Sequence, residues 1–357
     1  MSEGRYRAST DQMCGSAARP SLHRGITVLP ASVLLLVAAL LFGACAPDST
    51  GADAGSQAAG HNHDAATLHP DVLPVVEPIS RDPGEPLRVA ATTTIIGALV
   101  EEIVRQVGDA VRVDTIIGRG VEVHGFEPAP SDVRLLADAD IVFVNGFGLE
   151  VTLEPILDSL SAYVVPLAAG LDNPIAGDPH VWMSPRNVAV WINVIVEILG
   201  KADPANQTAY AAAGGVLATE VGTLDAEYTT SIGAIPIDDR VLVSDHENLD
   251  YAARDYGFTV IGTLIGGTSA AAEPSTRDLT DLARAIDSSN VRAILIDSAA
   301  SDSMWTLARA LVADTERHIA VLPILTASLA PAGQPGDTYV GFARFNLETL
   351  VRAMGGE

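Results

Sequence analysis

Three histidines in this sequence stand where they could bind a metal ion. His180 lies in Asp178-Pro179-His180-Val181-Trp182, directly before a stretch that reads as the start of a helix. His124 and His246 each follow an apolar run of the kind that forms a buried strand. In open α/β sheets, ligands bind at the carboxyl ends of the parallel strands. Three imidazoles that meet at such an edge would favour a divalent transition metal such as zinc.

Each histidine taken singly is more simply explained as a structural or surface residue, because most histidines bind no metal. Three histidines and a water also describe a catalytic zinc site, so a zinc hydrolase is a second interpretation. The sequence contains no His-Glu-x-x-His helix, although Glu247 beside His246 could act as a base. Both alternatives stay open at the level of these residues.

The amino-terminal residues 1–44 have the layout of an export signal, with several arginines before the apolar segment 26–44. A transmembrane anchor is the rival interpretation, because the segment is nearly long enough to span a bilayer. Leu41-Phe42-Gly43-Ala44-Cys45 resembles the lipobox of bacterial lipoproteins, with Phe42 at a usually aliphatic position. The resemblance implies cleavage before Cys45 and lipid attachment to its sulfur. The protein is then expected to be extracytoplasmic, lipid-anchored to the outer face of the cytoplasmic membrane.

The composition indicates that the chain after the export signal is globular and acidic. The chain has 357 residues, 48% of them hydrophobic, and a formal net charge of −24. That length suffices for two lobes, and that charge argues against nucleic acid as a partner. Cys14 would leave with the signal, so no disulfide is expected in the mature protein. Residues 45–86 are rich in Ala, Gly, Ser, Asp and Pro and are expected to form a flexible tether.

The rest of the chain alternates between strand-like and helix-like stretches, which predicts parallel sheets covered by helices. We expect an amino-terminal α/β lobe over residues 87–203 and a carboxyl-terminal α/β lobe over residues 233–357. One long helix with few strong apolar anchors, residues 204–232, is expected to link them. A helix is also expected from Leu149 to Leu160, and another beginning with Ser184 as N-cap. A cleft between the lobes is the expected ligand site.

Several motifs occur in the same order as in a known family, and the resemblance covers about residues 87 to 354. The chain is similar to the metal-binding lipoproteins that serve ABC transporters for zinc and manganese, the cluster A-I solute-binding proteins. The resemblance implies capture of a metal between the lobes and delivery to an ABC permease by a protein that is commonly monomeric. The motifs are His124-Gly125-Phe126-Glu127-Pro128, Ala139 to Gly146 leading to Leu149-Glu150, Asp178 to Trp182, His246 before Tyr251 and Tyr256-Gly257, and Gly336 to Tyr339.

The same resemblance implies four metal ligands. His124 and His180 match the two histidines of the first lobe, and His246 matches the third position, which is His in zinc-type members. The fourth ligand is often an aspartate in a Thr-Asp-Ser-like stretch, where this chain has Ala327. Zn²⁺ is therefore the expected cargo, with Mn²⁺ the alternative, because manganese prefers oxygen ligands. The carboxylates that could replace the aspartate are Glu122, Asp245, Glu247 and Asp337.

Two further residues have expected roles near the site. Asp178 could orient the ring of His180 or could simply be a turn residue before Pro179. Trp182 could screen the metal from solvent. If Ala327 marks a lost site, the chain would instead be a surface adhesion or scaffold lipoprotein with a degenerate metal site.

Overall fold

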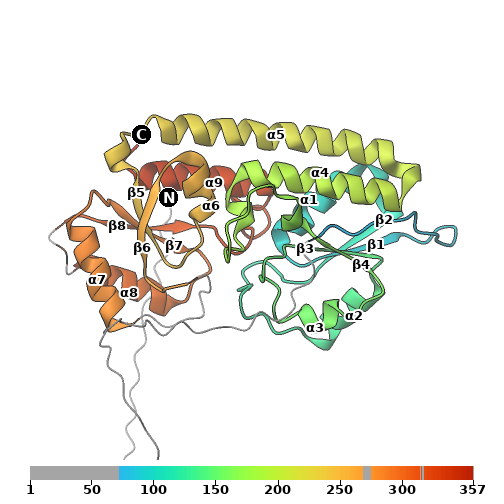
Figure 1. The fold of residues 1–357 in the computed structure, drawn as a ribbon, viewed down its shortest axis with the longest axis horizontal. Helices are drawn as coiled ribbons and strands as arrows, with labels where there is room; N and C mark the ends of the chain where they lie inside the picture. The colour runs from blue at the N-terminus through green and yellow to red at the C-terminus, as the bar shows by residue number, and fades with distance from the viewer. Residues whose placement is uncertain (1–71, 268–274, 314, 316, 357) are drawn as a thin grey trace, which may run out of the picture. The chain divides into compact units, whose positions relative to one another are not determined.

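A computed structural model describes residues 72–267, 275–313, 315 and 317–356 of the chain. Within this part, two four-stranded sheets lie under a layer of long helices (Figure 1). The export segment, Cys45 and most of the expected tether lie outside the described residues. Among the helices that are described, none is both long and apolar enough to cross a membrane.

The first sheet contains four parallel strands in the order β2-β1-β3-β4. Val89 pairs with Val113 on one side and with Ile141 on the other, so β1 and β3 are the central strands. Their side chains are almost all buried, as expected for strands covered on both faces. The elements of this lobe are β1 (Leu87–Ala91), α1 (Thr94–Val104), β2 (Val111–Thr115), α2 (Pro130–Asp138), β3 (Ile141–Val144), α3 (Glu154–Leu157), β4 (Tyr163–Pro166) and α4 (Pro185–Ala202).

The second sheet repeats this topology in the order β6-β5-β7-β8, again with every pair parallel. The prediction of two α/β lobes with parallel sheets is therefore confirmed. Short 3₁₀ turns cover Arg105–Ala110, Leu167–Gly170, Val181–Met183, Pro204–Asn206 and Ile237–Asp239. The elements of this lobe are β5 (Val241–Ser244), α6 (Asp250–Tyr256), β6 (Thr259–Thr263), α7 (Thr276–Asp287), β7 (Ala293–Asp297), α8 (Asp302–Ala313), β8 (Ala320–Ile324) and α9 (Tyr339–Ala353).

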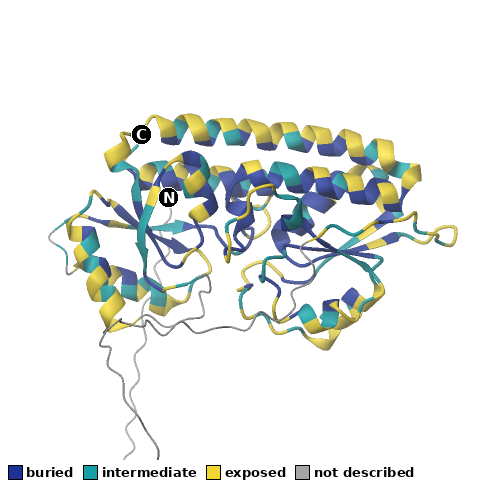
Figure 2. Cartoon of the chain, in the orientation of Figure 1, coloured by how far each residue is buried: buried dark blue, intermediate teal, exposed yellow. Residues whose placement is uncertain are grey.

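Helix α5 (Gln207–Gly233) has 27 residues and packs against α1 and α4 of the first lobe and against α9 of the second. Figure 2 shows its buried residues on one face and exposed residues on the other. The sequence suggested few strong anchors, but the buried row includes Tyr210, Leu217, Leu224 and Tyr228. Gly214 lets α4 come close, because a Cβ there would lie 2.2 Å from Val196 Cγ2.

The helix expected from Leu149 to Leu160 is reduced to the four residues of α3. The preceding residues instead bend around the buried carboxylate of Glu150, which accepts hydrogen bonds from the backbone N–H groups of Asn145 and Gly146. The hydroxyl of Thr92, after β1, donates to the same carboxylate at 2.7 Å. A buried acceptor that must be satisfied thus outweighs the helical pattern of the sequence.

The end of the expected tether is not flexible in the described part of the chain. Val76 is buried, and the backbone N–H of Ile79 donates to the carbonyl of Ala202 at 2.8 Å. Arg81 forms an ion pair with the buried carboxylate of Asp203 at 3.0 Å. Residues 72–86 therefore belong to the folded body, because they pack where α4 ends.

Ser184 stands at the N-cap position of α4 and Pro185 at its first turn, as expected. The hydroxyl of Ser184, however, forms no capping hydrogen bond. It donates instead to the carboxylate of Asp255 in α6 at 2.6 Å. This serine therefore connects the two lobes instead of stabilising the start of its own helix.

Candidate metal site

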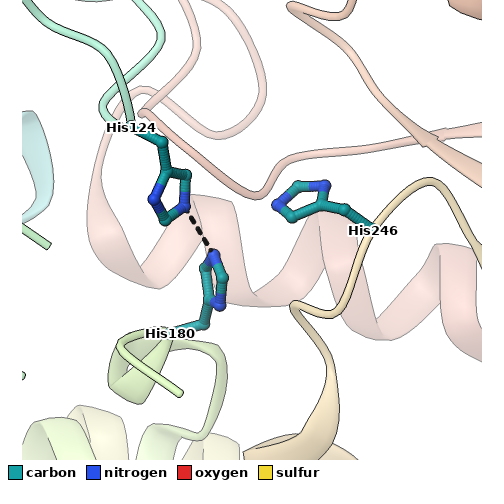
Figure 3. Close-up of side chains that lie close together, drawn as sticks. All are labelled: His124, His180 and His246. Carbon is teal, nitrogen blue, oxygen red and sulfur yellow. Dashed lines mark hydrogen bonds between the residues drawn. The ribbon is translucent and has the colours of Figure 1, made fainter. Parts of the chain in front are cut away.

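The three predicted histidines meet between the lobes (Figure 3). His124 comes from the loop after β2, His180 from the turn before α4, and His246 from the loop after β5. One ring nitrogen of each residue lies within 4.8 Å of the other two, and His124 Nε2 is 3.0 Å from His180 Nε2. Within the described ranges, this is the one convergent group of three or more His, Cys, Asp or Glu side chains.

The spacing of these nitrogens suits a tetrahedral metal ion. Zn–N bonds of 2.0 to 2.1 Å place two ligand nitrogens about 3.3 Å apart. The His124 and His180 pair at 3.0 Å is close to that separation. His246, which lies on the opposite side of the group in Figure 3, must approach slightly for all three to bind one ion.

Asp178 fixes the ring of His180. Its Oδ1 accepts a hydrogen bond from His180 Nδ1 at 2.8 Å and another from the backbone N–H at 2.9 Å. A proton held on Nδ1 leaves Nε2 free to bind metal. The side-chain amide of Asn145, at the end of β3, donates to the carbonyl of Pro179 at 2.9 Å and so holds this turn on the first sheet. Both expected roles of Asp178, in the turn and on the ring, are found.

Asp245 fixes the ring of His246 in the same way as Asp178 fixes that of His180. Its Oδ1 lies 2.9 Å from His246 Nδ1 and accepts the backbone N–H of His246 at 2.8 Å. Its Oδ2 accepts the backbone N–H of Asp297 at 2.7 Å. Both oxygens of Asp245 therefore accept hydrogen bonds that hold His246 and the end of β7, and Asp245 is not part of the convergent group of possible ligands.

The other expected carboxylates do not join the histidines either. Asp337 accepts the backbone N–H of Gly333, and Glu247 is exposed. Glu122 is exposed and accepts the backbone N–H of His124 at 3.1 Å. At the position of the expected aspartate, Ala327 lines the pocket and has no side-chain oxygen. The described donor set is therefore three imidazole nitrogens.

Burial and charge act differently on the three rings. Burial, together with the charges of the neighbouring histidines His180 and His246, lowers the pKa of His124 to about 3. Burial also lowers the pKa of His180, although Asp178 opposes this shift. Burial disfavours the charged form of His246 too, but the hydrogen bond and charge of Asp245 outweigh it, so its pKa is raised. Two of the rings are thus prepared as neutral ligands, and His246 is the most basic of the three.

Trp182 closes one side of the pocket. Its indole N–H donates to the carbonyl of Thr326 in the other lobe at 2.7 Å, and its ring centroid lies 5.4 Å from that of His180. Trp182 is 2% exposed and lines the pocket together with Val123, Thr326 and Ala327. This position agrees with the expected screening of the site from solvent.

Two functional contributors were missed in the sequence. Glu150 and Asp297 are buried acids that hold the pocket loops, although neither meets the histidines. Asp297 directly follows the apolar run of β7, which is the same signal that pointed to His246 after β5. Glu150 belongs to one of the family motifs in the sequence, but its role was not predicted, because it stands in a stretch with helical spacing.

Comparison with known proteins shows the family. Residues 89–353 match the family described as ZnuA, zinc-uptake complex component A, periplasmic. The chain belongs to this family. The ZnuA family consists of metal-binding transport proteins and not of enzymes, so the zinc hydrolase interpretation is excluded.

Relatives in the ZnuA family carry names with different metals. The iron-binding protein YfeA of Yersinia pestis is 26% identical over 77% of this chain and 88% of its own length. The zinc-binding protein TroA of Treponema pallidum is 27% identical over 76% of this chain and 89% of its own length. The manganese-binding lipoprotein MntA of Bacillus subtilis is 28% identical over 75% of this chain and 90% of its own length. The solved structure of TroA superposes with a TM-score of 0.70, covering 76% of this chain and 99% of TroA. Family membership therefore indicates a metal and leaves its identity open.

Proposed function

We propose that this protein captures a divalent transition metal, most readily zinc, with His124, His180 and His246 and delivers it to an ABC permease. The convergence of three ring nitrogens within 4.8 Å carries the proposal. Two of the rings have their Nδ1 atoms committed to carboxylates, so their Nε2 atoms are the available ligands. Carboxylate, histidine and metal in that order form a recurring arrangement in zinc sites.

The donor set favours zinc over manganese. Imidazole nitrogen is a borderline ligand that suits Zn²⁺, whereas Mn²⁺ prefers carboxylate and carbonyl oxygens. Ala327 offers no oxygen from its side chain at the pocket wall. The carboxylate of Asp245 bonds to Nδ1 of His246, and that of Glu122 accepts the backbone N–H of His124. Manganese remains the alternative cargo, because two relatives that are 26% and 28% identical to this chain are named as manganese-binding lipoproteins.

The two lobes would hold the metal together. His124 and His180 belong to the first lobe and His246 to the second, so one ion would join them. The lobes already share polar contacts, such as the one from Trp182 to Thr326 and the one from Ser184 to Asp255. Metal capture therefore needs a small approach of His246 and no wide closure.

The remaining assignments complete the proposal. Residues 1–44 would be removed as a lipoprotein signal, and Cys45 would carry the lipid anchor on the outer face of the cytoplasmic membrane. Residues 87–203 and 233–357 would form the lobes, with the helix at 204–232 between them. The protein would act as a monomer whose partners are the metal ion and the permease. Its net charge of −24 disfavours nucleic acid.

Metal content tests the proposal directly. The parent chain, purified without a histidine tag, is expected to hold about one zinc per chain after zinc is offered at micromolar concentration. The variant His180→Ala is expected to hold none, because the remaining pair of histidines no longer encloses the ion. If neither protein binds zinc, Ala327 marks a lost site, and the scaffold lipoprotein replaces the transport protein as the interpretation.

A further inference from the structure

Asp297 is a buried acid at the carboxyl end of β7 that binds no imidazole. It is 7% exposed and is not part of the histidine group. β7 lies beside β5, which ends directly before Asp245 and His246. The chain runs from β5 outward to β6 and then returns to β7 on the other side of β5. Asp297 therefore stands at the switch point of the second sheet, where α/β folds bind ligands.

The carboxylate of Asp297 holds the turn that forms one wall of the metal pocket. Its Oδ2 accepts the backbone N–H of Thr326 at 2.9 Å and that of Ala327 at 3.0 Å, and it also accepts the hydroxyl of Thr326. Its Oδ1 accepts the backbone N–H of Ala299 at 2.5 Å. Both oxygens are thus occupied by donors, and one side chain accepts both backbone N–H groups of the turn at 326–327.

The backbone of Asp297 connects this turn to a proposed ligand. Its N–H donates to Asp245 Oδ2 at 2.7 Å, while Asp245 Oδ1 lies 2.9 Å from His246 Nδ1. A displacement of His246 therefore acts on Asp245 and through it on the end of β7. These groups are buried, so hydrogen bonds between them are stronger than at the surface.

The turn at 326–327 connects in the other direction to the first lobe. The carbonyl of Thr326 accepts the indole N–H of Trp182 at 2.7 Å, and the Trp182 ring lies edge-on to His180. One path of buried contacts thus leads from His246 through Asp245, Asp297 and Thr326 to Trp182. It joins the ligands of the two lobes without passing through the metal.

We propose that Asp297 is a positioning residue that couples the placement of His246 to the contact between Thr326 and Trp182. Resting on the proposed zinc capture, this coupling transmits the movement of His246 on metal binding to the surface where the lobes meet. The loaded and metal-free forms then differ at Trp182, although the lobes stay in contact in both. Asp297 binds no metal itself and acts through Asp245 and the turn.

An asparagine at position 297 breaks the path in a defined way. Both carboxylate oxygens of Asp297 face N–H donors, so the amide NH₂ of asparagine must face a donor on one side or the other. The side chain keeps its volume, none of the three histidines is removed, and the backbone N–H at position 297 can still donate to Asp245. We therefore expect zinc to bind at the same stoichiometry with an affinity about 10-fold lower, in the range found for residues that support ligands.

Tryptophan emission provides a readout that metal content alone does not. In a Trp191→Phe, Trp305→Phe background of the full chain, Trp182 is the one indole, and zinc is expected to change its emission. The Asp297→Asn variant is expected to bind one zinc with that change reduced at least about threefold. Asp287→Asn, on the exposed end of α7, is the matched control and is expected to behave as the parent.

The outcomes separate this inference from the proposed function. A parent that binds no zinc overturns both. A parent that binds zinc without any change in Trp182 emission, or an Asp297→Asn variant with the full parental change, overturns the coupling alone. If Asp297→Asn does not fold, Thr326→Val decides, because it removes one bond to Asp297 and keeps the side-chain volume. An undiminished emission change in Thr326→Val then overturns the inference.

Discussion

His124 Nε2 and His180 Nε2 lie 3.0 Å apart in a pocket where both rings are shielded from water. Two N–H groups cannot face each other at this distance, so one nitrogen donates and the other accepts. His180 holds a proton on Nδ1 toward Asp178, which makes its Nε2 the acceptor and His124 Nε2 the donor. A bound metal ion would take the place of this shared proton.

The affinity for zinc should therefore decrease as the pH decreases. Metal ligation requires neutral imidazole, and His246, whose pKa is raised, must lose its proton to bind. Between pH 7.5 and 5.5 we expect a decrease of about 10- to 100-fold, corresponding to roughly one proton displaced per ion. Calorimetric titration in buffers of different ionisation enthalpy measures both the affinity and the protons released. Equal affinities at the two pH values would contradict the assignment of imidazole ligands.

Replacing Asp178 by asparagine should weaken the site without removing a ligand. Both bonds go to Oδ1, and the neutral amide oxygen of asparagine accepts them more weakly than the charged carboxylate does. We expect zinc affinity to fall about 10- to 100-fold, as for other carboxylates that orient a ligating histidine. Asp172→Asn is the matched control, because Asp172 is exposed in the same loop. Unchanged affinity in Asp178→Asn would show that the ring is held by packing alone.

The variant Ala327→Asp should shift the preference toward manganese. Ala327 lines the pocket beside the histidines, so a carboxylate there would add an oxygen ligand. We expect the affinity for Mn²⁺ to rise by about tenfold or more relative to that for Zn²⁺, a change of about 1.4 kcal/mol. Competition between the two ions, followed by metal analysis, measures the ratio. Ala327→Asn controls for side-chain size, and an equal shift in that variant would exclude a charge effect.

The metal-free protein should lose stability in mild acid. The pKa of His124 is lowered to about 3, so the unfolded chain binds more protons than the folded one below pH 6.5. Stability is then lost as pH falls from 6.5 toward 3, and His180, with a lowered pKa, adds to the loss. His246 acts in the opposite direction, because its raised pKa favours the folded state at low pH.

Urea unfolding of the parent and of His124→Gln at pH 7 and pH 5 isolates this effect. We expect the parent to lose about 1 to 2 kcal/mol more than the variant over this interval. Glutamine does not titrate, so a difference between the two proteins belongs to His124. The same loss in both would mean that other groups dominate acid unfolding.

The histidines could be predicted because each stands beside a local signal in the sequence. An apolar strand or a helix start is visible within about ten residues of His124, His180 and His246. In parallel sheets, strand ends meet at one edge, so the local signal also predicts convergence. The two lobes and their parallel sheets followed from the alternation of strand-like and helix-like stretches.

The supporting residues could not be predicted in this way. Thr326, which donates to the carboxylate of Asp297, is 29 residues away in sequence, and the carbonyl that Trp182 binds is 144 residues away. The short α3 depends on the partner of Glu150 after β1, 58 residues earlier. Val76 and Ile79 look like part of a polar tether until the surface beside Ala202 is known. Each case depends on a tertiary contact that no local pattern encodes.

The continuity of the packing under α5 has a consequence for how this molecule comes apart. One apolar core includes Phe143 of the first lobe, Leu224 of α5, and Leu242 and Phe342 of the second lobe. A smaller, separate cluster lies between the second sheet and the helices α7 and α8, each of which buries few side chains. Backbone amides of α7 and α8 should therefore exchange with solvent deuterium through local opening, whereas both sheets and α5 should exchange in a single global event. In thermodynamic terms, two lobes that share a core form one cooperative unit.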